Sequence, residues 1–149
     1  MPELAVDMAM MTGNVAQVFL HDDEWAETLS QIRSALRPAG LFAFETRIPS
    51  RRGWEEWTPA MTRRRANIVG VGFVEYSVSL VDVSLPFVSF QSTYRFIDRD
   101  IVLTSESTLR FRELKEIQES LEVAGFHIQE VRGAPDRPGR EWVVVADSE

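Results

Sequence analysis

The sequence predicts an α/β fold, and three observations support this prediction. Two apolar runs flank an amphipathic helix in the first third of the chain, a two-residue hydrophobic period runs through the middle, and a helix precedes a closing hairpin. The length of 149 residues is typical of one domain. We therefore expect a single domain over residues 1–149, made of a βαβ core (1–48), a loop with an antiparallel β insertion (49–112), and a helix with a hairpin (113–149).

The composition excludes several classes of partner and site. With 16 basic and 23 acidic residues the net charge is −7, which disfavours nucleic acid as a ligand. The absence of cysteine excludes disulfides, thiolate zinc sites and cysteine nucleophiles, and it fits a reducing compartment. The start of the sequence lacks the pattern of a signal peptide, and no apolar run approaches the roughly 20 residues of a membrane helix. We expect a cytoplasmic protein with no membrane partner.

The first element is an apolar run over Leu4–Met11, interrupted by Asp7 and ended by the turn Thr12-Gly13-Asn14. A run of this length and composition predicts a buried strand. The second apolar run, Leu41–Phe44, ends at Glu45-Thr46-Arg47 and predicts a second strand.

An amphipathic helix is expected between these strands. Asp22 and Asp23 offer an N-cap, and Pro38 and Gly40 are expected to end the helix. The apolar positions recur at helical spacing: Trp25, Leu29, Ile32 and Leu36. Strand, helix and strand form a βαβ unit, whose two strands should be parallel and buried under helices on the faces of the sheet.

The middle of the chain alternates apolar and polar residues from about residue 70. Three antiparallel strands are expected, carried by the stretches 74–80, 88–96 and 101–111. The preceding segment, Arg51–Arg65, shows no period, and we expect a mobile crossing loop.

The last part of the chain predicts a helix over residues 114–124 with Gly125 at its left-handed end. Phe126–Val131 and the run Trp142–Ala146 then predict a hairpin whose loop contains prolines.

This order of elements resembles the second half of class I S-adenosylmethionine-dependent methyltransferases of the small-molecule type. The resemblance is carried by the Thr12-Gly13-Asn14 turn, the helix ending Ile32–Gly40, the next strand, and the late Ala124-Gly125-Phe126 signal. It implies a partial Rossmann-like sheet with an inserted antiparallel β-layer over 70–112. It also implies S-adenosylmethionine as the methyl donor in the complete enzyme, with a small-molecule substrate.

The sequence departs from this family in one respect. The N-terminal strands and the glycine-rich loop that hold the donor have no counterpart, and we expect them upstream of Met1. Gly70-Val71-Gly72 does not replace that loop, because it precedes an alternating strand and does not open a helix.

Candidate site residues follow the carboxyl ends of the first two strands, where open α/β sheets bind ligands. By resemblance, Thr12, Gly13, Asn14 and Gln17 would bind the cofactor; the alternative is a simple turn with a solvated Gln17. Glu45 and Arg47 are candidates for substrate binding; the alternative for Glu45 is an ion pair with Arg47 or with another arginine. Trp54 and Trp57 could stack on a substrate, or pack their loop onto the body of the protein.

Other charged groups have simpler explanations. We expect no metal site, because the acids of His21-Asp22-Asp23-Glu24 suit a helix start. His127 is expected on an exposed strand, and Arg63-Arg64-Arg65 on a solvated face. The sequence contains no hydrolase elbow, paired-histidine metal motif or Walker loop, and it identifies no catalytic residue.

The leading hypothesis is therefore methyl transfer from S-adenosylmethionine to a small molecule in the complete enzyme, with this chain an incomplete form. The alternative is a non-catalytic module for small-ligand binding or dimerisation. A truncated sheet would expose the edge of its first strand, so we also expect self-association through that strand.

Overall fold

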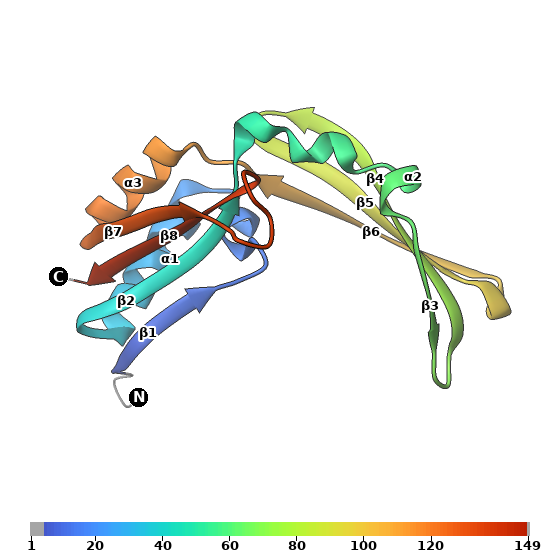
Figure 1. Cartoon of the computed structure of the whole chain (residues 1–149), viewed down its shortest axis with the longest axis horizontal. Helices are drawn as coiled ribbons and strands as arrows, with labels where there is room; N and C mark the ends of the chain where they lie inside the picture. The colour runs from blue at the N-terminus through green and yellow to red at the C-terminus, as the bar shows by residue number, and fades with distance from the viewer. Residues whose placement is uncertain (1–4, 149) are drawn as a thin grey trace. The chain divides into compact units, whose positions relative to one another are not determined.

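The computed structural model describes residues 5–148, and the chain divides into two compact units. The core unit consists of the segments up to Arg51 and from Arg110 onward, and the insertion unit is Arg52–Leu109 (Figure 1). The insertion unit covers nearly the same residues as the β insertion expected over 49–112. That residues 1–149 fold as a single domain stays a prediction.

The core unit contains a four-stranded sheet in the order β1-β2-β8-β7. Its strands are β1 (Val6–Met11), β2 (Leu36–Arg47), β7 (Phe126–Gly133) and β8 (Glu141–Ser148). The β1–β2 pair is parallel, whereas β8 is antiparallel to both β2 and β7. The predicted βαβ unit and closing hairpin are confirmed, although Leu4 lies outside the described residues.

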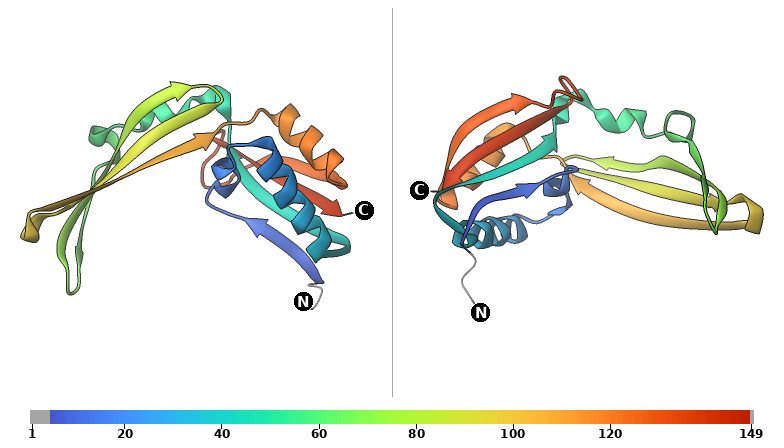
Figure 2. Two further views of the ribbon diagram at one scale, coloured as in Figure 1. Left: turned by 180° about the vertical axis from the view of Figure 1, so that it is seen from behind. Right: turned by 60° about the horizontal axis from the view of Figure 1, so that its bottom comes forward.

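Helices α1 (Asp22–Ala35) and α3 (Leu114–Val123) cover one face of this sheet (Figure 2, left). They contact each other through Trp25, whose Nε1 donates a hydrogen bond to Ser120 Oγ over 2.9 Å. The core lies between these helices and the sheet, and its fully buried side chains include Leu29, Phe42, Leu121 and Val144.

The opposite face of the sheet is less well covered. Met8 is 46% exposed and Met10 is 65% exposed on β1, and Leu41 is exposed beside them on β2. The prediction of a buried first strand is therefore wrong for the described residues. The apolar run did predict a strand, but burial depends on which elements pack against it.

The ends of α1 also differ from the prediction. His21 is the N-cap and makes no side-chain capping bond, while Asp22 and Asp23 lie in the first turn, where they suit the helix dipole. The helix ends at Ala35, before Pro38 and Gly40, because Leu36 adopts an extended conformation and begins β2. The end of α3 agrees with the prediction, since Gly125 has φ +83°.

The insertion unit holds a second four-stranded sheet in the order β3-β4-β5-β6. Its strands are β3 (Arg64–Ile68), β4 (Gly72–Ser84), β5 (Phe87–Phe96) and β6 (Ile101–Arg110). The three predicted strands are confirmed, and β3 is an additional one. Sequence periodicity missed β3 because all five of its residues are exposed.

The segment predicted as a mobile loop has defined structure. It contains the last residue of one 3-10 helix (Pro49–Arg51), a second 3-10 helix (Gly53–Glu56), the helix α2 (Pro59–Thr62) and the start of β3. Thr58 caps α2 by accepting a hydrogen bond from the Met61 N–H, and the Thr62 hydroxyl accepts one from the Val78 N–H over 2.8 Å. These contacts attach the segment to β4. No helix in the described part of the chain is long and apolar enough to cross a membrane.

Candidate functional site

A group of polar side chains lies at the carboxyl ends of β1 and β2, where the topology predicts a ligand site. We call it the polar cluster; it consists of Gly13, Asn14, Gln17, Glu45, Arg47, Arg137 and Glu141. All of these residues belong to the core unit.

The turn after β1 gives the cluster its backbone geometry. Gly13 and Asn14 are both left-handed, with φ of +66° and +59°, and the 3-10 turn η1 (Val15–Val18) follows. The Gly13 N–H donates a hydrogen bond to Glu45 Oε1 over 2.6 Å. This bond ties the end of β1 to the end of β2, so Glu45 holds the turn in place.

Gln17 is not solvated, since only 1% of its surface is exposed. Its Oε1 accepts a hydrogen bond from Arg47 Nη1 over 3.0 Å, and its Nε2 donates to the Arg110 carbonyl over 3.4 Å. Both ends of the side chain are thus used inside the protein. Gln17 therefore links the side chain of Arg47 to the backbone of Arg110.

The hairpin between β7 and β8 supplies two further residues. Arg137 bridges both carboxylates of the cluster: its Nη1 donates to Glu141 Oε1 over 2.9 Å and its Nη2 donates to Glu45 Oε2 over 3.3 Å. Glu141 is 3% exposed and also accepts a hydrogen bond from Asn14 Nδ2 over 2.9 Å. Sequence reasoning missed Arg137 and Glu141. The register of β8 against β2 places Glu141 opposite Arg47, and no local sequence pattern indicates that pairing.

The two guanidinium groups respond differently to this environment. Burial lowers the pKa of Arg47, and the nearby positive charge of Arg137 acts in the same direction, against the attraction of Glu141 and Glu45. Burial also acts against the charge of Arg137, but the attraction of Glu141, Asp136 and Glu45 outweighs it and raises the pKa of that group. Within the cluster, the positive charges of Arg47 and Arg137 are therefore balanced by the negative charges of Glu45 and Glu141.

Two buried oxygen atoms of the cluster have no hydrogen-bond partner among the described residues. They are Asn14 Oδ1 and Glu141 Oε2, on side chains that already contact each other. A buried acceptor without a partner costs about 1–3 kcal/mol. The pair is therefore suited to accept hydrogen bonds from a ligand group or a water molecule.

A second group of charges in the core unit has a structural role. The Arg112 guanidinium lies 5.4 Å from the Trp25 ring, and Arg110 pairs with Asp22 over 3.0 Å. Burial and the charge of Arg110 lower the pKa of Arg112. The cavity beside them measures only about 10 Å³, enough for a single water molecule.

The tryptophans proposed for substrate binding belong to the insertion unit. Trp54 is buried, and Trp57 packs edge-on against Phe90 of β5 with ring centroids 5.0 Å apart. Both side chains therefore contribute to packing.

The remaining charged candidates have protein partners. Arg63 pairs with Glu75 over 3.6 Å, Arg65 lies over the Phe73 ring, and exposed His127 lies 3.5 Å from Asp147. Among residues 5–148, no three His, Asp or Glu side chains gather closely enough to hold a metal ion.

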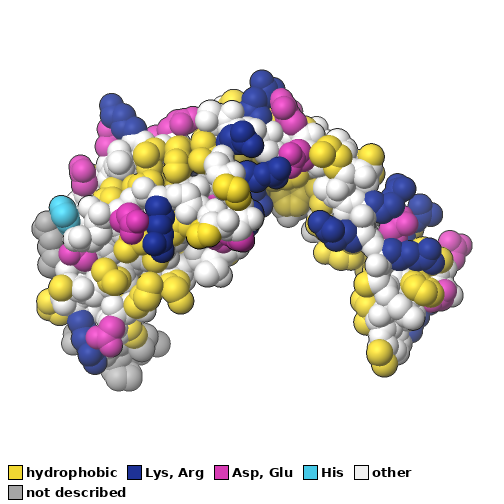
Figure 3. Space-filling model, in the orientation of Figure 1, with side chains coloured by type: hydrophobic (Ala, Val, Ile, Leu, Met, Phe, Trp, Pro, Cys, Tyr) yellow, Lys and Arg dark blue, Asp and Glu magenta, His cyan; other side chains and the backbone are white. Residues whose placement is uncertain are grey.

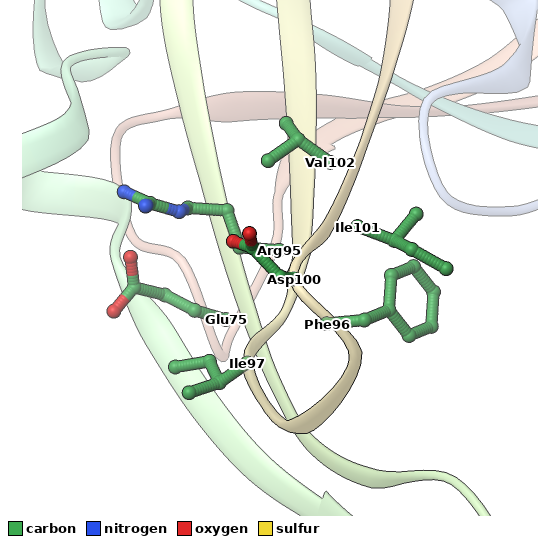
Figure 4. Close-up of a pocket in the computed structure, with 7 residues that line it drawn as sticks. All are labelled: Glu75, Arg95, Phe96, Ile97, Asp100, Ile101 and Val102. Carbon is green, nitrogen blue, oxygen red and sulfur yellow. The ribbon is translucent and has the colours of Figure 1, made fainter.

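The insertion unit has a shallow hollow of about 270 Å³ near the β5–β6 turn. Figure 4 shows that Glu75 and Arg95 point to one side of the sheet, whereas Phe96 and Ile101 point to the other. Because a ligand site needs convergent polar groups, this hollow is a weaker candidate than the polar cluster.

Solved structures that are similar to this chain include several methyltransferases. The CcbJ methyltransferase from Streptomyces caelestis superimposes on 100% of this chain with a TM-score of 0.72 and 16% identity. The chain has a methyltransferase fold. CalS10, an amino pentose methyltransferase from Micromonospora echinaspora, matches 98% of the chain with a TM-score of 0.69 and 12% identity. The sugar N-methyltransferase KedS8 from Streptoalloteichus sp. matches 97% with a TM-score of 0.71 and 13% identity.

The methyltransferase fold is matched over only part of these enzymes. The chain covers 60% of CcbJ, 59% of CalS10 and 57% of KedS8. No family model matches the sequence, and no curated protein matches it.

Proposed function

We propose that this chain forms part of a small-molecule methyltransferase that uses S-adenosylmethionine, and that its polar cluster lines the ligand site. The observation that carries this proposal is the superposition of the whole chain on CcbJ with a TM-score of 0.72. The position of the cluster, beyond the carboxyl ends of β1 and β2, supports it.

The polar cluster fits only some groups of such a methyl donor. Its ammonium and ribose hydroxyls donate hydrogen bonds, and the unpartnered oxygens of Asn14 and Glu141 suit them. The donor's carboxylate needs N–H groups, but the backbone N–H of Gly13 and the side-chain amides of Asn14 and Gln17 already donate hydrogen bonds within the chain. The described residues therefore do not form a complete donor site, and we derive no catalytic step from them.

Within this proposal, Thr12, Gly13 and Asn14 lie on the donor side, and Gln17 acts as a positioning residue through Arg47. Glu45 and Arg47 lie on the substrate side. Roles for Trp54 and Trp57 in substrate binding are a weaker part of the proposal, given their packing.

CalS10 and KedS8 act on sugars, so we propose an amino sugar or a similar amine-bearing small molecule as the substrate class. An intracellular location is also part of the proposal.

Calorimetric titration with S-adenosylhomocysteine tests the proposal. We expect binding in the range of about 0.1–1 mM, because only part of the site is present. Asn14→Ala should weaken it by about two- to tenfold, the effect of one hydrogen bond, whereas Gln31→Ala on the exposed side of α1 should not. Equal binding by both variants, or no binding by the wild-type chain, would contradict the proposal.

The second candidate function is a non-catalytic dimerisation module. The observation that favours it is the exposed methionine surface of β1, where Met8 is 46% exposed and Met10 is 65% exposed.

A further inference from the structure

Arg137 covers the two carboxylates of the polar cluster. Its side chain is 39% exposed, whereas those of Glu45 and Glu141, which it bridges, are 17% and 4% exposed. The guanidinium therefore lies on the outer side of both carboxylates. A ligand that approaches these carboxylates from solvent meets Arg137 first.

The contact of Arg137 with Glu45 is the longest of its three contacts with carboxylates. The distance from Nη2 to Glu45 Oε2 is 3.3 Å, compared with 2.9 Å from Nη1 to Glu141 and 3.1 Å from Nε to Asp136. Hydrogen bonds between an N–H cation and a carboxylate are usually about 2.7–2.9 Å long. Glu45 is held independently of Arg137, because its other oxygen accepts the hydrogen bond of 2.6 Å from the Gly13 N–H. Another cation can therefore replace the guanidinium at Glu45 with little rearrangement.

The backbone around Arg137 is fixed by hydrogen bonds of its own. The Arg137 N–H donates to the Ala134 carbonyl over 3.1 Å, and the Arg140 N–H donates to the Arg137 carbonyl over 3.2 Å. The Arg140 carbonyl in turn accepts a hydrogen bond of 3.0 Å from the N–H of Ile48, the residue after β2. The Arg137 side chain can thus leave the carboxylates while the loop between β7 and β8 keeps its conformation.

We propose that Arg137 occupies the subsite for a substrate's amine, and that the amine, as an ammonium, replaces the guanidinium between Glu45 Oε2 and Glu141 Oε1. This inference rests on the proposed function and adds the residues that recognise the amine. An ammonium has three N–H donors. Glu141 Oε2, which has no hydrogen-bond partner among the described residues, provides the third acceptor.

The exchange of one cation for another makes Arg137 a specificity-determining residue. An ammonium restores the positive charge that the guanidinium takes away, whereas a neutral ligand would leave two mostly buried carboxylates without that counter-ion, which is unfavourable. Figure 3 shows acidic and basic side chains next to one another at several places on the core unit, as in the polar cluster. Removing the charge of Arg137 alone should therefore change the local charge balance and favour a cationic ligand.

An amide NMR titration of the chain with D-glucosamine, at a pH where its amine is protonated, tests this subsite. N-acetyl-D-glucosamine is the matched neutral probe. Arg137→Gln removes the competing charge, so we expect it to raise the affinity for D-glucosamine at least about fivefold and to leave the affinity for the neutral probe unchanged. Arg132→Gln is the control, because Arg132 is 59% exposed on β7 and pairs with Glu130, outside the cluster.

A second substitution at the same position and a double variant sharpen the test. Arg137→Lys keeps the charge but loses the planar group that bridges both carboxylates, so we expect a smaller gain in affinity for D-glucosamine. Adding Glu45→Gln to Arg137→Gln should abolish the gain, because it removes one of the two carboxylates that hold the ammonium. The dispersion of the amide spectrum shows whether each variant is folded.

The outcomes separate this inference from the proposed function. A gain that Glu45→Gln reverses supports the subsite, and it does so even where the chain fails to bind S-adenosylhomocysteine and the proposed function is wrong. Binding of S-adenosylhomocysteine without a gain for D-glucosamine in folded Arg137→Gln would overturn the subsite alone. An equal gain for the neutral probe would also overturn it. An equal gain for S-adenosylhomocysteine would overturn it too, by assigning the subsite to the ammonium of the donor.

Discussion

Asn14 donates a hydrogen bond from its side-chain amide to Glu141 Oε1 over 2.9 Å, and this contact joins residues 127 positions apart. It links the turn after the first strand to the beginning of the last one. Through Arg137, Glu141 is connected further to Glu45 at the end of β2. Hydrogen bonds to the carboxylates of Glu141 and Glu45 thus hold together the three segments that bound the candidate site.

Replacing Glu141 should therefore destabilise the core unit. Glu141→Ala removes the partner of Asn14 and the closer partner of Arg137, and we expect a loss of about 2–4 kcal/mol in the free energy of unfolding. Glu141→Gln retains an acceptor and should cost less. Urea denaturation measures both, with the exposed Glu130→Ala as the control. A cost for Glu141→Ala no larger than that of the control would show that the cluster is not held in this way.

The Trp25–Ser120 hydrogen bond should contribute to the packing of α1 against α3. A double-mutant cycle with Trp25→Phe and Ser120→Ala should give a coupling energy of about 1 kcal/mol, because the indole N–H and the hydroxyl are paired over 2.9 Å. Thermal or chemical unfolding of the four proteins supplies the measurement. Fully additive effects would mean that the two helices pack without this contact.

Gly72 should tolerate substitution poorly. It has φ +96°, and a Cβ at this position would collide with the carboxylate of Asp98, which accepts a hydrogen bond from the Phe73 N–H. We expect Gly72→Ala to cost about 2 kcal/mol or more, whereas Gly53→Ala meets open space and should change stability by less than about 1 kcal/mol. The midpoint of urea unfolding compares the two. Similar midpoints would contradict the role assigned to Gly72.

Local sequence patterns predicted most of the helices and strands, because apolar spacing and capping residues reflect the local conformation of the chain. The spacing of Trp25 and Leu29 indicated α1, and Gly125 marked the end of α3. β3 escaped prediction because its residues, such as Arg64 and Asn67, are exposed and show no apolar period. The exposure of β1 could not be predicted from its methionines, since it depends on which elements pack against each face of the sheet.

The candidate site was predictable only where it follows from topology. The ends of β1 and β2 pointed to Asn14, Gln17 and Glu45 before the structure was known. Arg137 and Glu141 come from a distant hairpin, and only the pairing of β8 with β2 brings them to the cluster. The hydrogen bond between Arg47 and Gln17 is likewise a contact that no sequence spacing indicates.

Donor binding by the polar cluster can be examined residue by residue in an amide NMR titration of the chain with S-adenosylhomocysteine. We expect saturable shift changes at residues 12–17 and at Glu141, with the α3 residue Val123 unaffected. Changes confined to other parts of the chain, or none at ligand concentrations of about 5 mM, well above the expected dissociation constant, would contradict it.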